Sequence, residues 1–216
     1  MEYEDRDLIQ ERYLDFSLIH RHCVVQVVEV LNKMRKHSLE TYYHLVHVAN
    51  IAGLIAQDET LGLDREAISR IYTAGLLHDI GKLAVSANLL HSKCDENGKE
   101  LIQQTHIIEG KKMLDEILWD DRIVEIACHH HERLDGSGYP QGLKDKDLSL
   151  EDRIVQVADV ASALTMPRSY KDGYLDKTTA GKILTSIADR GLLDSRLVAI
   201  LNGVLAKENI TDELLK

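Results

Sequence analysis

Proline and large aromatic side chains are scarce in this 216-residue sequence, which has two prolines, one phenylalanine and one tryptophan. Because proline removes a backbone hydrogen-bond donor and clashes with the preceding helical turn, its scarcity favours long helices. No apolar run approaches the roughly 18 residues of a membrane-spanning helix, and none follows a basic start. We therefore expect neither a transmembrane span nor a signal peptide.

Positive charge is also in deficit, with 26 Lys and Arg against 36 Asp and Glu and a formal net charge of −10. Such a surface disfavours binding to duplex nucleic acid or anionic membranes. A small anionic substrate stays compatible, because bound divalent metals can reverse the local charge. The three cysteines, Cys23, Cys94 and Cys128, have no motif spacing, so we predict reduced thiols and a cytoplasmic protein.

Histidine is abundant, with eleven residues, and apolar residues recur at three- and four-residue steps along most of the chain. This period is typical of amphipathic helices, and no segment alternates with the period of a strand. The fold is therefore predicted to be all-α. We expect helices over about residues 18–34, 39–57, 153–164, 177–190 and 195–205. Three more are expected, one after Asp64 through Leu77, one from about Lys99, and one after Asp120 that holds Ile123 to Ala127. Asp64, Asp120, Ser149 and Asp194 are predicted as N-terminal caps.

No proline-rich or low-complexity linker divides the chain. Residues 1–36 are predicted to form an N-terminal helical extension, and residues 37–216 the main domain. The valine-rich helix of the extension has two interpretations. It could complete the core of the domain, which we favour, or it could pair with a second copy to form a homodimer.

The strongest local motif is His78-Asp79-Ile80-Gly81-Lys82, at the end of an apolar helix. Imidazole offers a neutral nitrogen ligand, and a carboxylate with two oxygens can bridge two metals. Lys82 follows His78 by four residues, so we expect it on the same helix face, where its ammonium could meet a phosphate oxygen. Taken alone, a His-Asp pair at a helix end is about as often a chance dipeptide as it is a metal-binding pair.

A second motif is the run His129-His130-His131-Glu132, which follows the apolar segment Ile123–Ala127 and precedes a glycine-rich loop. Consecutive histidines on an apolar helix are poor core residues, and metal coordination gives them a reason to be buried and neutral. Surface decoration is the less favoured reading, because of the apolar lead-in. The glycines would let the backbone approach a ligand closely.

Further ligand types occur elsewhere in the predicted helices. Glu40 and His44 are four residues apart and share a helix face, while His106 and Asp159 each stand alone in a helix. Taken singly, a helical histidine or aspartate is usually a satisfied structural group. Their weight as candidate ligands comes from occurring together with the two motifs.

These motifs resemble those of the HD-GYP family, a branch of the HD-domain metal-dependent phosphohydrolases. The match consists of HDIGK at 78–82, HHERLDGSGYP at 130–140 and ADVASALT at 158–165 followed by Arg168, and it covers about residues 38–205. The resemblance implies a helical bundle with two or three divalent metals, commonly iron or manganese. It also implies a phosphodiesterase that hydrolyses cyclic di-GMP to GMP through the linear dinucleotide.

The resemblance also assigns roles to individual residues. Asp79, as a bridging ligand, and Lys82 would be catalytic, and Glu40 would add a third metal. The implied metal ligands are His44, His78, Asp79, His106, His130, His131 and Asp159, together with Glu40. The implied substrate-binding residues are Lys82, Tyr139, Arg168 and Lys171.

The sequence departs from the family pattern in three places. An arginine is usual where His47 stands, an acidic residue is common where Ser162 stands, and the segment at 166–170 is altered. These changes bear on nucleotide specificity and leave the ligand set intact. His129 is an additional histidine, which we interpret as structural. The adjacent ligand pair could instead be His129 and His130, but the position of Glu132 favours His130 and His131.

Two other functions stay open on the sequence alone. The chain could be an HD phosphohydrolase for another cyclic dinucleotide or nucleotide, or a sensor that binds a cyclic dinucleotide without cleaving it. A sensor would typically have lost ligands, and none is lost here. The metal is also open, because histidine with carboxylate suits iron, manganese, nickel or zinc.

Overall fold

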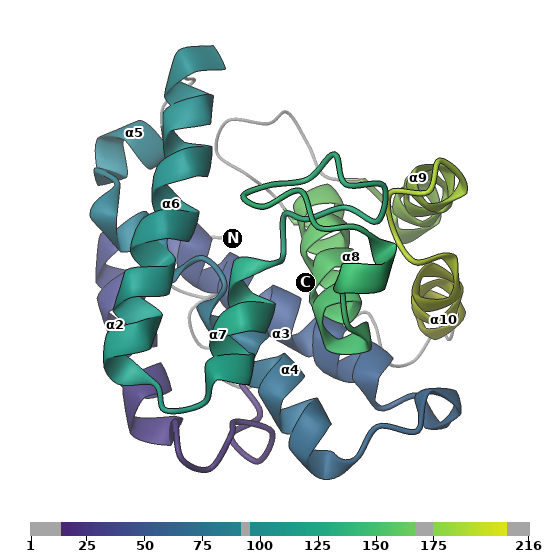
Figure 1. Cartoon of the computed structure of the whole chain (residues 1–216), viewed down its shortest axis with the longest axis horizontal. Helices are drawn as coiled ribbons and strands as arrows, with labels where there is room; N and C mark the ends of the chain where they lie inside the picture. Colours follow the sequence, from purple (N-terminus) through teal and green to yellow (C-terminus); the bar gives the residue numbers. More distant parts are fainter. Residues whose placement is uncertain (1–13, 92–95, 167–174, 207–216) are drawn as a thin grey trace.

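A computed structural model describes residues 14–91, 96–166 and 175–206, and its regular elements over these ranges are all helical (Figure 1). This confirms the predicted all-α fold. The α-helices are α2 (Val24–His37), α3 (Leu39–Ala56), α4 (Arg65–Leu77), α5 (Ala87–His91), α6 (Glu96–Ile117), α7 (Asp121–Cys128), α8 (Leu150–Thr165), α9 (Lys177–Asp189) and α10 (Ser195–Leu205). Short 3-10 turns are η2 (Glu59–Leu61), η3 (Ile80–Ala84) and η4 (Asp145–Asp147).

Polar caps fix where several helices begin. The Asp64 carboxylate accepts a hydrogen bond from the backbone of α4, and Asp120 and Asp194 do the same for α7 and α10. Ser149 and Asp152 form a reciprocal capping box at the start of α8. These four predicted caps are confirmed, and each satisfies backbone N–H groups that the first helical turn leaves unpaired.

Helix α3 is the centre of the core. It is apolar on nearly all sides, as expected for a helix surrounded by others, and it packs against α4 and α8. Helix α4 approaches so closely that a Cβ added at Gly75 would meet the Ala49 backbone at 2.9 Å. In Figure 1, α2 and α6 lie to one side of this centre, with α9 and α10 on the other.

Helix α2 packs against α3 and α4, and its buried face includes Val27 and Met34. That face belongs to the same hydrophobic core as α3. The predicted boundary after residue 36 remains a prediction. The expected helix from Leu18 begins only at Val24, because residues before it form turns, in one of which the His20 N–H donates to the Thr73 hydroxyl.

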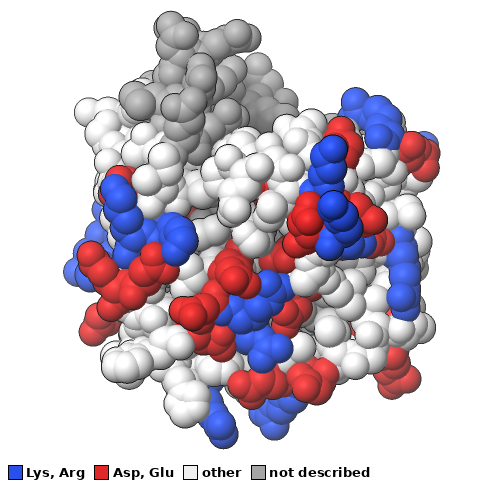
Figure 2. Space-filling view, viewed as in Figure 1, with Lys and Arg blue, Asp and Glu red and all other residues white. Residues whose placement is uncertain are grey.

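None of the helices that the structure describes is long and apolar enough to cross a membrane. On the face shown in Figure 2, basic and acidic side chains are intermixed. Ion pairs join Arg122 to Glu125 and Glu151, and Arg70 is a second partner of Glu151.

Candidate metal centre

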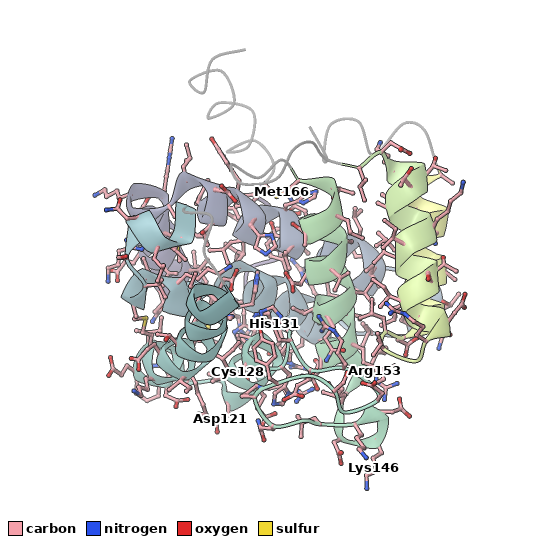
Figure 3. All side chains as sticks on the ribbon, turned by 90° about the horizontal axis from the view of Figure 1, so that it is seen from above. Asp121, Cys128, His131, Lys146, Arg153 and Met166 are labelled. Atoms are coloured by element: carbon pink, nitrogen blue, oxygen red, sulfur yellow. The ribbon has the colours of Figure 1, made fainter. Side chains whose placement is uncertain are left out.

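The structure brings seven of the eight predicted ligands, all but Glu40, from distant parts of the sequence into one buried centre. Figure 3 shows His131 near the middle of the molecule, while Asp121 and Lys146 lie toward its edge. The ligands come from five different helices or from the residues just after them. His44 comes from α3, His78 and Asp79 from the end of α4, His106 from α6, His130 and His131 from the turn after α7, and Asp159 from α8.

The candidate ligands form two groups, and within each group one ligand atom per residue lies within 4.8 Å of the others. The first group is His44, His78 and Asp79, and the second group is His106, His130 and His131. Asp79 also reaches the second group, because its two oxygens face in different directions. Its Oδ2 lies 3.3 Å from Nε2 of His78, whereas Oδ1 lies 3.5 Å from Nε2 of His106.

Asp159 makes a second connection between the groups. Its Oδ1 lies 3.1 Å from Nε2 of His44, and its Oδ2 lies 3.7 Å from Nδ1 of His131. Two carboxylates therefore lie between two sets of imidazoles. A carboxylate with one oxygen toward each of two cations is the usual arrangement of a bridging ligand.

The hydrogen bonding of the imidazoles fits metal ligation. Nδ1 of His78, His106 and His130 lies 2.9, 2.8 and 2.6 Å from the carbonyl oxygens of Gly75, Ile102 and Ala127. Because a carbonyl only accepts, each Nδ1 carries the hydrogen, and the neutral ring has its lone pair on Nε2. These three Nε2 atoms and Oδ1 of Asp79 are buried and have no hydrogen-bond partner.

Buried polar atoms without partners are costly, so native structures rarely retain them without a ligand. The orphaned atoms here are all on predicted ligands, apart from Nε2 of His47 and Oε1 of Gln156 among those that the structure describes. Backbone carbonyls that orient metal-binding imidazoles through their other nitrogen are a recurring feature of metal sites. The residues present therefore fit divalent metal ions.

The two carboxylates are held ionised. Burial alone would raise the pKa of Asp79, but the Lys82 ammonium and the His78 imidazole lower it well below its usual range. Burial likewise opposes ionisation of Asp159, yet the hydrogen bond and charge of His44 lower its pKa well below the ordinary value. Two buried negative charges side by side are stabilised when cations are present.

The imidazoles of the second group are held neutral. Burial lowers the pKa of His130 well below its usual value and that of His131 to about 3, and it lowers the pKa of His106 as well. His78 differs: burial opposes its protonation, but the charges of Asp79 and Asp159 raise its pKa. Neutral imidazole is the form that binds a metal.

Lys82 does not share an α-helical face with His78, as the spacing had indicated. Helix α4 ends at Leu77, and the chain continues through Asp79 into the 3-10 turn η3. This tighter turn brings Nζ of Lys82 to 2.5 Å from Oδ2 of Asp79. The expectation of the same face is thus wrong, yet the ammonium lies at the centre.

The close approach of η3 to α6 depends on a glycine. A Cβ added at Gly81 would lie 1.8 Å from the carbonyl oxygen of His106 and 2.5 Å from the backbone nitrogen of Gly110. No side chain fits there, so the HDIGK turn can pack directly on the helix that carries His106. The sequence showed the glycine but not this contact.

The histidine run lies beyond a helix and not on one, because α7 ends at Cys128 and the next residues form a turn. The carboxylate of Glu132, which is fully buried, accepts hydrogen bonds from the backbone N–H groups of Gln141 and Leu143. These bonds fold the glycine-rich loop back, and the Tyr139 ring lies 4.7 Å from the His131 ring. In the sequence, Glu132 indicates only the register of the histidine pair.

The sequence also predicts Glu40, Arg168 and Lys171 as site residues. Glu40 lies in the first turn of α3, one turn before His44, and is outside both ligand groups. Its role in a third metal site remains a prediction. Arg168 and Lys171 lie outside the described residues. Nδ1 of the additional His129 lies 3.3 Å from Oδ1 of Asp152, away from the two groups.

The chain is similar to a known domain family and to several characterised proteins. The sequence profile of the HD domain matches residues 23–197. The 3'3'-cGAMP-specific phosphodiesterase 1 of Vibrio cholerae is 36% identical over 162 residues, which cover 74% of this chain and 37% of that protein. The cyclic di-GMP phosphodiesterase response regulator RpfG of Xanthomonas campestris is 38% identical over 173 residues, covering 77% of this chain and 44% of that protein.

The chain therefore spans less than half the length of these two relatives. Among solved structures, an HDG"Y"P protein from Bdellovibrio bacteriovorus aligns with a TM-score of 0.62 at 24% identity, over 75% of this chain and 51% of that one. The HD domain of the L. monocytogenes phosphodiesterase PgpH, in complex with cyclic-di-AMP, aligns with a TM-score of 0.61 at 18% identity, over 82% and 93%. Both structures share the fold.

Proposed function

Because the chain belongs to the HD domain family, we propose that it is a metal-dependent phosphodiesterase that hydrolyses a cyclic dinucleotide. The observation that carries the proposal is the placement of Asp79 between two histidine groups, with one carboxylate oxygen toward each. Relatives from two organisms that are named as cyclic dinucleotide phosphodiesterases support the substrate class.

The residues that would hold the metals are those of the two groups together with Asp159, which, like Asp79, has oxygens toward both groups. Such metals, when bound, supply Lewis acidity that activates a water nucleophile and offsets charge on the phosphoryl oxygens. Iron or manganese is the proposed identity, following the family resemblance. Because none of the implied metal ligands is missing from the sequence, we favour an enzyme over a sensor that binds a cyclic dinucleotide without cleaving it.

The side chains around the centre would bind and orient the substrate. The Lys82 ammonium lies beside Asp79 with part of its side chain exposed, so it can meet a phosphoryl oxygen. Tyr139 is held against His131 by the loop that Glu132 folds back, which places its ring at the edge of the centre. Contacts of Arg168 and Lys171 with the nucleotide are part of the same proposal.

Cyclic di-GMP is the first proposed substrate, with GMP as the product through the linear dinucleotide. A second candidate is 3'3'-cGAMP, because two Vibrio cholerae relatives at 36% and 35% identity are named for it. Ser162 and His47, which differ from the family pattern, lie beside the proposed ligand His44, where they bear on the choice between these substrates. A location in the cytoplasm and a possible homodimer through the N-terminal helix are further proposals, and both are based on the sequence alone.

The test is turnover by protein purified without oxygen and loaded with iron or manganese. Cyclic di-GMP, 3'3'-cGAMP and cyclic di-AMP are each incubated with the wild type and with the His78→Ala/Asp79→Ala variant, and products are separated by chromatography. We expect metal-dependent hydrolysis of at least one dinucleotide by the wild type alone. Binding without product at full metal occupancy would contradict the proposal and favour the sensor.

A further inference from the structure

The hydroxyl of Ser162 lies between two buried imidazoles. Its Oγ is 2.8 Å from Nδ1 of His44 and 2.9 Å from Nδ1 of His47, which places both nitrogens within hydrogen-bonding distance. Ser162 is on α8, and the two histidines are one turn apart on α3. All three side chains are buried. The contact therefore joins His47, which is outside both ligand groups, to a proposed ligand.

This arrangement differs from that of the other ligands. At His78, His106 and His130 the partner of Nδ1 is a backbone carbonyl, which can only accept a hydrogen bond. A serine hydroxyl can either donate or accept, so by itself it does not decide where the hydrogen of His44 resides. A third group has to set its direction, and His47 is the group in contact.

Counting hydrogens gives the direction. When Nε2 of His44 offers its lone pair to a metal, the ring hydrogen is on Nδ1, which donates to the Ser162 oxygen. Ser162 Oγ has no other hydrogen-bond partner in the part of the chain that the structure describes, so its one hydrogen goes to Nδ1 of His47, and the hydrogen of the neutral His47 ring is then on Nε2. That Nε2 atom is buried and has no hydrogen-bond partner.

We propose that Ser162 is a positioning residue that relays a hydrogen bond between His44 and His47 and fixes the tautomers of both. The proposal rests on the proposed function only in taking His44 as a metal ligand. It assigns His47 a defined task, namely to accept the Ser162 hydrogen so that the hydroxyl oxygen faces His44 as an acceptor. Loss of the hydrogen-bonded partner of a metal-binding imidazole typically lowers metal affinity by about 10- to 100-fold.

The relay also connects two positions, 47 and 162, at which this sequence departs from the family pattern. His47 stands where an arginine is usual and Ser162 where an acidic residue is common, 115 residues apart in the sequence. In the structure they touch, so a neutral hydrogen-bonded pair takes the place of two charged side chains. Burying a neutral pair avoids the desolvation cost of buried charges, while an acceptor for His44 is kept.

The direct test is nitrogen-15 NMR of the imidazoles in the wild-type protein loaded with zinc, which is diamagnetic. We expect His44 to carry its hydrogen on Nδ1 and His47 to carry its hydrogen on Nε2. A His47 ring with its hydrogen on Nδ1 would overturn the relay. The measurement needs no variant and does not depend on turnover.

A second test uses the Ser162→Ala variant, with zinc affinity measured by competition against a chelator. We expect the affinity to fall about 10- to 100-fold. The matched control is Thr165→Val, which removes a hydroxyl from the same helix that bonds only the Ala161 carbonyl among its recorded partners. Unchanged zinc affinity in Ser162→Ala would overturn the relay.

The two proposals fail in different ways. The predicted tautomers in a protein that hydrolyses no cyclic dinucleotide would support the relay and contradict the proposed function. Hydrolysis by a protein whose His47 hydrogen is on Nδ1 would support the function and overturn the relay.

Discussion

The ammonium of Lys82 lies 2.5 Å from Oδ2 of Asp79, the same carboxylate oxygen that faces His78 at 3.3 Å. This geometry follows from the end of α4, where the chain leaves the α-helix and tightens into η3. The positive charge is thereby fixed at the proposed metal centre, next to Asp79, which we propose as a bridging ligand.

We predict that the Lys82→Met variant keeps its metal content but loses about 10²- to 10³-fold in kcat, the usual cost of removing one group that stabilises charge in a transition state. Steady-state kinetics with the substrate identified by the turnover test measures this. Lys111→Met is the control, since Lys111 is largely exposed and pairs with Asp115 one helical turn away. A kcat equal to that of the wild type would remove Lys82 from the mechanism.

A pair of glycine substitutions tests the packing of η3 on α6. Gly81→Ala would force a methyl group into the His106 backbone, so we predict a loss of about 3 kcal/mol or more in the free energy of unfolding, together with weaker metal binding. Gly203→Ala on α10 meets nothing within 4 Å and should stabilise the protein by up to about 1 kcal/mol. Urea unfolding of both variants checks this; equal stabilities would refute the close approach.

The pH dependence of stability in the metal-free protein follows from the buried histidines. The pKa is lowered in His106 and His130, and it falls to about 3 in His47 and His131, with burial the largest cause in each. Unfolded histidines protonate near pH 6.5. The unfolded chain therefore binds more protons below that pH, and stability must fall as the pH drops from about 6.5 toward about 3.

The raised pKa of His78 favours the folded state as the pH drops, but this one histidine is outweighed by the four histidines whose pKa is lowered. Each net proton contributes a slope of up to about 1.4 kcal/mol per pH unit. Urea unfolding with a chelator present, at about pH 7, 6 and 5, should show a steady decline. The exposed His22→Gln variant should keep the wild-type slope. Stability that stays constant over this range would contradict the buried neutral state.

Glu40 tests how many metals bind. The resemblance to a third-metal pattern predicts three ions in the wild type and two in Glu40→Ala, counted by elemental analysis of protein loaded without oxygen. Glu29→Ala, an exposed change on α2, is the control and should keep the wild-type count. The same count in the wild type and Glu40→Ala would show that Glu40 holds no ion.

Sequence patterns predict most helices of this fold because polar caps mark their starts. Helix α10 begins one residue after its predicted cap, Asp194, and α4 begins one residue after Asp64. The start of α2 was misplaced because its cap, Cys23, makes no side-chain cap hydrogen bond and so leaves no polar signal. Periodicity alone does not tell a helix from apolar turns that precede it.

The members of the centre were predictable, but their arrangement was not. Motif spacing identifies His78 and Asp79, while the direction of each Asp79 oxygen depends on how α6 and the turn after α7 pack around it. The contact between Ser162 and His47 joins α8 to α3, and the sequence shows these residues only as separate departures. Such contacts arise from tertiary packing.

The most direct test of the metal centre is anomalous diffraction from crystals of the protein loaded with manganese, recorded on both sides of the metal absorption edge. We predict peaks about 2.0–2.3 Å from Nε2 of His78, His106 and His130, with Asp79 between them. No peak among these nitrogens in crystals of metal-saturated protein would contradict it.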